Sequence, residues 1–520
     1  MNLLKAAATV SGFTFLSRVT GLVRDTLLAR TFGAGDSMDA FFVAFRIPNL
    51  LRRLFAEGAF SQAFVPLLGR IKSEQGDAAA QGVIDAIAVI LLWVLVLVSI
   101  VGVVGAPVLV WLMASGWAQS KPATFETTVL LTRIMFPYIA CMSLVAMASG
   151  VLNTWRHFVV PAFTPVLLNL CMIAAAWGLT PYFNPPIVAL AVGVMVGGLA
   201  QLAIQIPALK RVGALPRLST PFKTAWRHEG TRSVLKNMAP ALLGVGVAQI
   251  ALLINTQIAS HLVSGSVSWL SFADRLMEFP TALLGVALGT VLMPSLTKAA
   301  ASDDQSQFNA LLDWGLRLTC LLALPAAAAL VLLAQPLVAV LFHYGKFTAH
   351  DVAMTQAAVA TYAVGLIGFS LIKILAPAFY AQQNIKTPVK IAIAVLVVGQ
   401  IANVFTVPWL GHAGLALSIS MGALLNAVLL YWGLRRKTGG EARFTAKAGW
   451  LKYTAQLLFA LLGMAAWLWW SAAQLNWLAL QATPWLRVSY LLGICALGAG
   501  IYFALLALCG VKLKAFARRV

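Results

Sequence analysis

The sequence has 520 residues, of which 61% are hydrophobic and only 10% are charged. Soluble globular chains hold about 45–50% apolar and about 25% charged residues, so this composition excludes a water-soluble enzyme of several domains. Lysine and arginine together number 37 against 16 acidic residues, which gives a net charge of +21. Because so apolar a chain leaves little room for charge, the positions of the cations are its most informative feature.

Apolar runs long enough to cross a membrane follow one another along the whole chain. A membrane-spanning helix needs about 20 apolar residues, and interior glycine and proline are common in such helices. Strand-like alternation is absent, so we expect an all-α polytopic membrane protein with 14 transmembrane helices. The expected helices are 6–31, 36–69, 80–113, 125–152, 158–180, 186–211, 231–263, 267–299, 307–342, 349–380, 386–408, 412–435, 446–473 and 484–510.

The loops between these helices carry a strongly asymmetric charge. With the N-terminus placed in the cytoplasm, 24 of the cations fall in cytoplasmic segments and only Lys121 and Lys346 fall in the opposite loops. The positive-inside rule then places both termini in the cytoplasm. The basic tail Lys512–Arg519 follows from this topology, and its charge also suits anionic lipids or a protein partner.

Eleven cations remain in or at the edge of the expected helices. Each charge at the bilayer centre costs at least about 2.5–3.5 kcal/mol, so we expect these side chains to line a water-filled cavity. Six of the eleven fall between residues 18 and 53. The eleven are Arg18, Arg24, Arg30, Arg46, Arg52, Arg53, Arg133, Arg275, Arg317, Lys373 and Arg487.

A weak internal repeat divides the chain into two parts. Pro66 aligns with Pro294 when the chain is offset by 228 residues, and Pro161 aligns with Pro388 at an offset of 227. Two copies with six helices each give pseudo-symmetric lobes, an arrangement typical of transporters. The predicted parts are an N-lobe at 1–211, a cytoplasmic linker at 212–230, a C-lobe at 231–436, and two further helices with a basic tail at 437–520.

The first cluster of charge is Arg18, Arg24 and Asp25. On a regular helix Arg18 and Asp25 share a face and Arg24 points elsewhere, unless Gly21 relaxes the helix and redirects it. One carboxylate cannot neutralise two arginines, so we predict an anion-binding site gated by Asp25. The alternative is an arginine–aspartate pair that only neutralises itself.

The second cluster extends from Asp39 to Glu57. Asp39, Arg46 and Arg53 recur every seven residues and form one stripe, and Arg53 reaches Glu57 four residues on. These residues fit a structural ladder of ion pairs. Arg52 is rotated by about 100° from Arg53 and has no partner on that stripe, so it is the better candidate for binding a ligand.

The third cluster is Asp274, Arg275 and Glu278, in the helix expected at 267–299. Here too the alternative is a self-contained pair, between Arg275 and Glu278. Arginine keeps its charge at any accessible pH and its planar fork suits phosphate. The sequence therefore predicts an anionic, phosphorylated substrate. The predicted substrate-binding residues are Arg18, Arg24, Arg52 and Arg275, and the predicted gating or charge-pairing residues are Asp25, Asp39, Glu57, Asp274 and Glu278.

Several kinds of site are missing from the sequence. It has no GxxxxGK[ST] loop, so we expect no nucleotide hydrolysis by this chain. Its six histidines and five cysteines are scattered without metal-ligand spacing, and we predict no metal, no cofactor and no catalytic residue. Nor do we expect a nucleic-acid partner, because topology accounts for most of the basic residues.

Long segments of the chain resemble one known family. SRVTGLVRD, DAFFVAFRIPNLLRRLFAEGAFSQAFVP, GSVSWLSFADRLMEFPTALLGVALGTVLMPSLTKA, YGKFTAHD and KTPVKIAIA are similar to the lipid II flippases called MurJ or MviN. That family belongs to the multidrug/oligosaccharidyl-lipid/polysaccharide (MOP) exporter superfamily. The likeness runs from the N-terminus to the basic tail, and the second and third segments are long and specific.

The resemblance implies a bacterial inner-membrane protein that moves lipid II, the undecaprenyl-diphosphate-linked disaccharide-pentapeptide, to the periplasmic leaflet for peptidoglycan synthesis. It implies alternating access without ATP hydrolysis, and leaves open contacts with cell-wall synthesis proteins. It assigns a critical cationic cavity and places a groove for the polyprenyl tail at the last two helices. Some members bind sodium through carboxylates in helices 7, 11 and 12, but those helices hold no acidic residue here. The matching cavity positions are Arg18, Arg24, Asp39, Arg52 and Arg275, with Glu57 and Asp274 nearby.

Three other functions stay open at this point. A flippase for another polyprenyl-diphosphate-linked glycan needs the same phosphate chemistry, and only the family segments argue against it. A drug or cation antiporter of the same superfamily predicts a cavity dominated by carboxylates, which the eleven cations disfavour. A membrane glycosyltransferase needs a catalytic carboxylate in a sizeable external domain, and no loop here exceeds about 30 residues.

Overall fold

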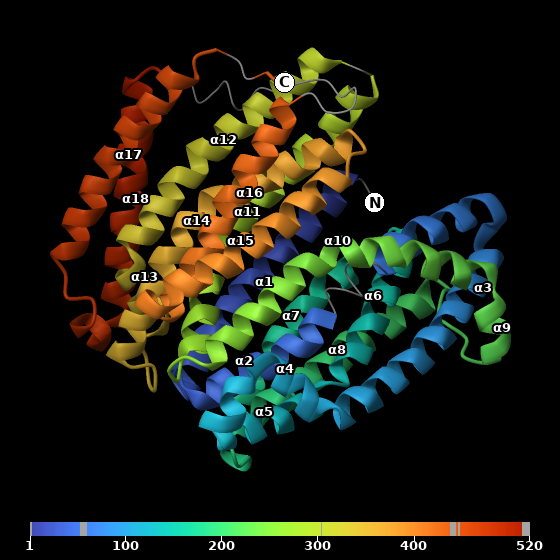
Figure 1. Cartoon of the computed structure of the whole chain (residues 1–520). Helices are drawn as coiled ribbons and strands as arrows, with labels where there is room; N and C mark the ends of the chain where they lie inside the picture. The colour runs from blue at the N-terminus through green and yellow to red at the C-terminus, as the bar shows by residue number, and fades with distance from the viewer. Residues whose placement is uncertain (1–2, 52–59, 303, 437–443, 446–447, 512–520) are drawn as a thin grey trace. The chain divides into compact units, whose positions relative to one another are not determined.

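The computed structural model describes residues 3–51, 60–302, 304–436, 444–445 and 448–511. Every long element among these residues is a helix and none is a strand, which confirms the all-α fold (Figure 1). Ten helices within the described ranges are long and apolar enough to cross a membrane. The number of 14 spanning helices stays a prediction.

The chain divides into two compact units, Met1–Ser268 and Trp269–Val520. The predicted division into lobes at 211 and 231 stays a prediction. The helices of the first unit are α1 (Leu3–Phe32), α2 (Asp36–Leu51), α3 (Ser61–Val104), α4 (Ala106–Ser120), α5 (Pro122–Met135), α6 (Tyr138–Thr154), α7 (Val159–Ala174), α8 (Val188–Arg211), α9 (Phe222–Arg227) and α10 (Glu229–Ser260). Those of the second are α11 (Ser266–Ala301, which begins at the boundary), α12 (Gln305–Leu332), α13 (Ala334–Phe342), α14 (Ala349–Ala381), α15 (Lys386–Leu410), α16 (His412–Arg435), α17 (Trp450–Ala473) and α18 (Pro484–Leu508).

The longest helix of the first unit is α3, with 44 residues. The sequence predicts that one helix ends at residue 69 and the next begins at 80, and within this interval α3 consists of two helical stretches that meet at a kink. Gly76 alone departs from helical geometry there, with a φ of 84° that only glycine adopts without strain. Phe64, Leu68 and Ile84 of α3 pack with Val151 of α6 in an apolar core of this unit.

The basic segment after α8 packs against α3. Gln81 of α3 donates to the carbonyl of Leu215 at 2.9 Å, and Asp85 accepts from the backbone N–H of Arg217 at 2.8 Å. Farther along, Ala225 of α9 is fully buried in a small cluster with Ala86 and neighbouring residues of α3. The segment between α8 and α10 is therefore held to the helix beside it by defined contacts.

In the second unit, α14 and α16 approach each other closely at two glycines. A Cβ atom on Gly365 would lie 2.7 Å from Ser420 Cα, and one on Gly368 would lie 2.6 Å from the Ala423 carbonyl carbon. Both neighbours are backbone atoms, which cannot move without shifting α16. Small residues allow this kind of backbone contact between transmembrane helices.

We expect Gly368→Val to destabilise the protein by about 1–3 kcal/mol, because the larger side chain must push α16 away from α14. Gly399→Val in α15 is the matched control, since a Cβ there has no heavy atom within 4 Å. Thermal unfolding of the two purified variants in one detergent measures the difference. Equal melting temperatures would contradict the close packing of α14 on α16.

Candidate functional site

Arg24 and Asp25 form a buried ion pair in the middle of α1. The Arg24 Nε and Nη2 atoms lie 2.9 and 2.7 Å from one oxygen of Asp25, and Nη1 donates to the side-chain oxygen of Asn169 at 2.9 Å. Arg24 is 8% exposed and Asp25 is 4% exposed. The first unit thus holds a guanidinium in low-dielectric surroundings, oriented by groups on two helices.

The sequence predicts that Arg24 points away from Asp25, because adjacent helical residues differ by about 100°. This prediction is wrong. The long arginine side chain bends back to its neighbour, and α1 remains helical through Gly21. Gly21 faces Asn169, whose amide nitrogen would lie 3.5 Å from a Cβ at that position, an ordinary van der Waals contact.

Asn169 of α7 was not predicted from the sequence. Besides accepting from Arg24, its amide nitrogen donates to the Ser17 carbonyl at 2.9 Å and to Thr20 Oγ1 at 3.1 Å. It therefore joins α7 to α1 across the ion pair. An asparagine in an otherwise apolar helix is a signal that could have indicated this role.

The side chain of Arg18, on α1, is partly buried. Within the part of the chain that the structure describes, no hydrogen bond or ion pair joins it to another side chain. The arginine–aspartate pair of this cluster forms between Arg24 and Asp25, not between Arg18 and Asp25. Arg18 therefore keeps its donors available for a ligand.

Asp39, at the start of α2, holds the turn that leads into α11. It is 1% exposed and accepts from the backbone N–H of Gly265 and of Ser268, each at 2.8 Å, and from Ser268 Oγ at 2.5 Å. The predicted ion pair with Arg46 does not form, since these donors occupy Asp39. Asp39 thus has a structural role in satisfying buried backbone donors.

Arg46 lies two turns after Asp39 and donates to Thr256 Oγ1 of α10 at 2.6 Å. The remaining residues of the second predicted cluster, Arg52, Arg53 and Glu57, lie outside the described residues. The ion-pair ladder beyond Arg46 and the assignment of Arg52 as a ligand therefore stay predictions.

In the second unit, Arg275 and Glu278 form the pair expected from their spacing. Their N–O distance is 2.8 Å, and their side chains are 43% and 45% exposed. A pair this accessible contributes about 0–1 kcal/mol to stability, so replacing Glu278 by another anion at Arg275 costs little free energy. Asp274 lies beside them and is also exposed.

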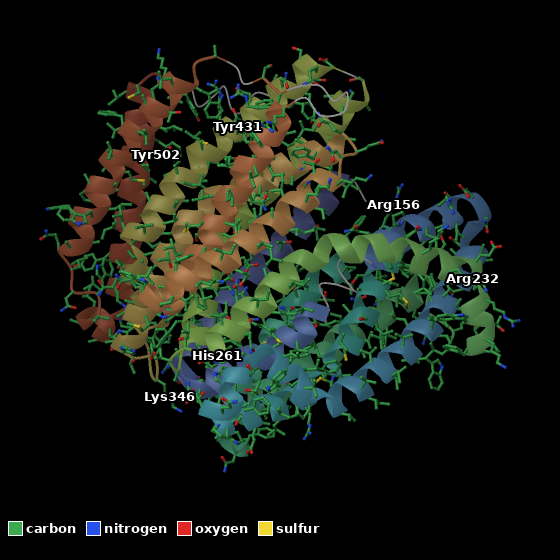
Figure 2. All side chains as sticks on the ribbon, in the orientation of Figure 1. Arg156, Arg232, His261, Lys346, Tyr431 and Tyr502 are labelled. Atoms are coloured by element: carbon green, nitrogen blue, oxygen red, sulfur yellow. The ribbon has the colours of Figure 1, made fainter. Side chains whose placement is uncertain are left out.

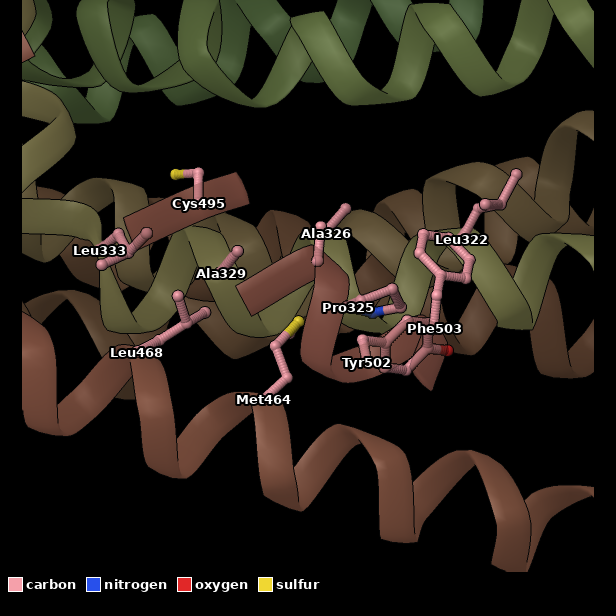
Figure 3. A pocket seen from close by; sticks show the side chains of 11 residues that line it. Leu322, Pro325, Ala326, Ala329, Leu333, Met464, Leu468, Cys495, Tyr502 and Phe503 are labelled. Carbon is pink, nitrogen blue, oxygen red and sulfur yellow. The ribbon is translucent and has the colours of Figure 1, made fainter. Parts of the chain in front are cut away.

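An apolar groove of about 270 Å³ lies between α12, α17 and α18 (Figure 3). Its lining residues include Pro325 of α12, Leu333 directly after that helix, Met464 and Leu468 of α17, and Tyr502 of α18. Many of the large side chains that α17 and α18 expose are apolar, including Phe459, Leu462 and Leu497. The groove is suited to a hydrocarbon chain, because it offers apolar contact and almost no hydrogen-bonding groups.

Two sets of hydrogen bonds hold α17 and α18 against α12. Pro325 has no N–H and leaves the Leu321 carbonyl without its helical donor; Tyr502 Oη of α18 donates to that carbonyl at 2.9 Å. Near the start of α17, Trp450 Nε1 donates to Asp313 Oδ1 of α12 at 2.7 Å, and Arg317 Nη2 of α12 donates to the carbonyl of Ala448, just before α17, at 3.1 Å. The walls of the groove are thus fixed by polar contacts at separate levels.

No group of three or more histidine, cysteine, aspartate or glutamate side chains that could hold a metal ion occurs among the described residues.

Comparison with known proteins assigns the chain to a family. The family model described as lipid II flippase MurJ matches residues 28–487. A lipid II flippase MurJ of Burkholderia cenocepacia is 53% identical over 519 residues, which cover 100% of both chains. A protein of Vibrio cholerae named probable lipid II flippase MurJ is 42% identical, with 99% of this chain and 97% of the relative covered.

Solved structures agree on the fold. A lipid II flippase MurJ in an inward closed conformation has a TM-score of 0.76 and 23% identity, covering 95% of this chain and 98% of that chain. An inward-facing multidrug resistance MATE family transporter of the MOP superfamily has a TM-score of 0.68 and 16% identity, covering 80% and 93%. This chain is a multi-pass membrane protein, and it belongs to the lipid II flippase MurJ family.

Proposed function

We propose that this protein moves lipid II from the cytoplasmic to the periplasmic leaflet of the bacterial inner membrane, as a transporter without ATP hydrolysis. The observation that carries the proposal is the 53% identity with a lipid II flippase MurJ over the full chain. The buried guanidinium of Arg24 and the apolar groove at α17 and α18 supply the two chemistries that a diphosphate-linked lipid requires.

Arg18, Arg24, Arg52 and Arg275 bind the diphosphate in this proposal. Arg18 has donors to spare, and the exposed pair of Arg275 with Glu278 exchanges its carboxylate readily. Arg24 differs, because Asp25 already occupies the edge of its guanidinium. The diphosphate therefore displaces Asp25, which makes this carboxylate a competitor that holds the arginine while substrate is absent.

The polyprenyl tail lies along the groove of α12, α17 and α18 in this proposal. Each buried methylene contributes about 0.8 kcal/mol relative to water, but little relative to the bilayer interior. The groove therefore contributes position rather than affinity: it keeps the tail beside the protein while the polar head crosses by alternating access.

The membrane potential is the proposed source of energy. With both termini in the cytoplasm and the inside negative, outward movement of one negative charge gains about 2.3 kcal/mol per 100 mV. We expect the transfer rate of lipid II in reconstituted vesicles to rise when such a potential is applied. Equal rates with and without a potential would contradict this part of the proposal.

Depletion of the protein in its own cells tests the function itself. We expect lipid-linked peptidoglycan precursor to accumulate where periplasmic reagents cannot reach it, while total precursor stays constant or rises. Unchanged accessibility would contradict the proposal. Accumulation of a different polyprenyl-diphosphate glycan would assign the protein to that substrate instead.

A further inference from the structure

One arginine of the second unit is buried without an acidic partner. Arg487, in the first turns of α18, has 0% of its surface exposed. Its Nη1 atom lies 3.4 Å from the carbonyl oxygen of Trp477, and its Cζ atom lies 4.9 Å from the ring centre of Tyr344. Its Nε and Nη2 atoms are buried and have no hydrogen-bond partner within the described part of the chain.

These two unpartnered atoms lie along one edge of the guanidinium. Nε–H and Nη2–H point in the same direction and form the fork that accepts a carboxylate or a phosphate with two hydrogen bonds. In Arg24 both atoms of this edge contact Asp25, and in Arg317 the Nε atom contacts Asp313. The Nε and Nη2 atoms of Arg487 make the same edge, but no carboxylate among the described residues contacts them.

The position of Arg487 is unfavourable for a purely structural cation. A positive charge near the N-terminus of a helix is repelled by the helix dipole, by about 0.3–1 kcal/mol at exposed sites. A buried charge without a partner is more costly, since its lost hydration is not replaced. Such residues inside membrane proteins are retained mainly where they bind something.

His343, at the end of α13, adds a second polar group. It is 7% exposed, and its Nδ1 atom is buried without a partner among the described residues. Burial and the nearby charge of Arg487 both lower the pKa of His343. An anion at Arg487 would offset that charge. Lys346, exposed in the following turn, supplies another cation close in sequence (Figure 2).

The aromatic residues around this site indicate its depth in the membrane. Trp485 is 86% exposed and Tyr490 is 41% exposed near the start of α18, and Trp469 and Trp470 are exposed near the end of α17. Exposed tryptophan and tyrosine concentrate at the level of the lipid headgroups. A phosphate at this depth is most abundantly that of a phospholipid.

We propose that the free edge of Arg487, together with His343, binds one phosphate oxyanion, supplied by the headgroup of a membrane phospholipid. Because Arg487 has no exposed surface, binding requires the side chains around it to move aside. The inference does not rest on lipid II transfer, and it uses none of the arginines assigned above to the diphosphate.

The test uses the full chain, purified and delipidated in an uncharged detergent. Thermal unfolding is followed on addition of dioctanoyl phosphatidylglycerol, of inorganic phosphate, or of dioctanoylglycerol, which has the same chains but no phosphate. We compare wild type with Arg487→Met and with Arg133→Met, a control that removes an exposed arginine of α5. Native mass spectrometry counts the phospholipids that remain bound.

We expect phosphatidylglycerol to raise the melting temperature of wild type and of Arg133→Met saturably, by about 3 °C or more, and dioctanoylglycerol to have no effect. Arg487→Met should lose this rise and one bound lipid, and without lipid it should be at least as stable as wild type, since it lacks the unpaired charge. If that variant does not fold, Arg487→Lys should fold and bind the phospholipid at least about 10-fold more weakly.

Three results would overturn the proposal. The first is an equal response of Arg487→Met and wild type to phosphatidylglycerol. The second is a lipid-free Arg487→Met less stable than wild type, which would mean that the edge is already satisfied, by water for example. The third is a rise with inorganic phosphate but not with phosphatidylglycerol, which would make the ligand a free ion.

Discussion

An Arg24→Lys variant should insert and fold like wild type but transfer lipid II at least about 10-fold more slowly. Lysine keeps the charge that Asp25 requires, so the buried carboxylate is not left alone. Lysine lacks the planar guanidinium that donates two parallel hydrogen bonds to a phosphate. Each charge-assisted hydrogen bond that is lost contributes about 1.5–3 kcal/mol. Transfer into the outer leaflet of reconstituted vesicles, normalised to the amount of inserted protein, measures the effect.

Arg30→Lys is the matched control, because Arg30 lies on the same helix and is exposed. It should leave the rate within about two-fold of wild type. Arg24→Ala is expected to abolish complementation of a depleted strain, but it also leaves Asp25 buried without its arginine, so the lysine variant is the cleaner test. Full transport by Arg24→Lys would show that the diphosphate does not use this fork.

An Asp39→Ala variant should destabilise the first unit by about 2–4 kcal/mol. The carboxylate accepts from two backbone N–H groups and one hydroxyl, and alanine leaves these buried donors without an acceptor. Asp39→Asn keeps one acceptor oxygen and should lie between the two. Unfolding in a graded mixture of mild detergent and dodecyl sulfate measures the differences.

Asp36→Ala serves as the control for this experiment. Asp36 lies one turn before Asp39 and accepts a hydrogen bond from Ser264, in the same loop before α11 that Asp39 contacts. Its side chain is 50% exposed, and its ion-pair partner Lys121 is partly exposed. We expect a loss below about 1 kcal/mol. A similar loss for both variants would contradict the capping role assigned to Asp39.

The sequence predicts the fold well, because the bilayer imposes one simple rule. Backbone groups in hydrocarbon must bond within their own helix, so composition and run length indicate an all-α protein. Boundaries are less precise: the sequence leaves residues 70–79 out of the helices, whereas the structure keeps the residues on both sides of Gly76 helical and bends the chain at that glycine. The positive φ of Gly76 marks where the two stretches meet, but it does not show how far each of them extends.

The candidate site was predictable only in part. Arg275 and Glu278 are three residues apart, so helix periodicity alone brings them together. Asn169 meets Arg24 across 145 residues, and Gly265 meets Asp39 across 226. Such contacts depend on which helices become neighbours, and charge spacing within one helix carries no information about that. The predicted pair of Asp39 with Arg46 fails for this reason.

The proline in α12 also bears on the register in which α18 packs beside the groove. A regular helix offers a sliding neighbour no preferred stopping place, since each of its interior carbonyls already has a donor. At Leu321 the missing N–H of Pro325 leaves one acceptor, and the hydroxyl of Tyr502 takes it. A shift of α18 by one turn, about 5.4 Å, would move that hydroxyl to a carbonyl already in use. The hydroxyl of Tyr502 thus favours the observed register of α18 on α12 over a register shifted by one turn.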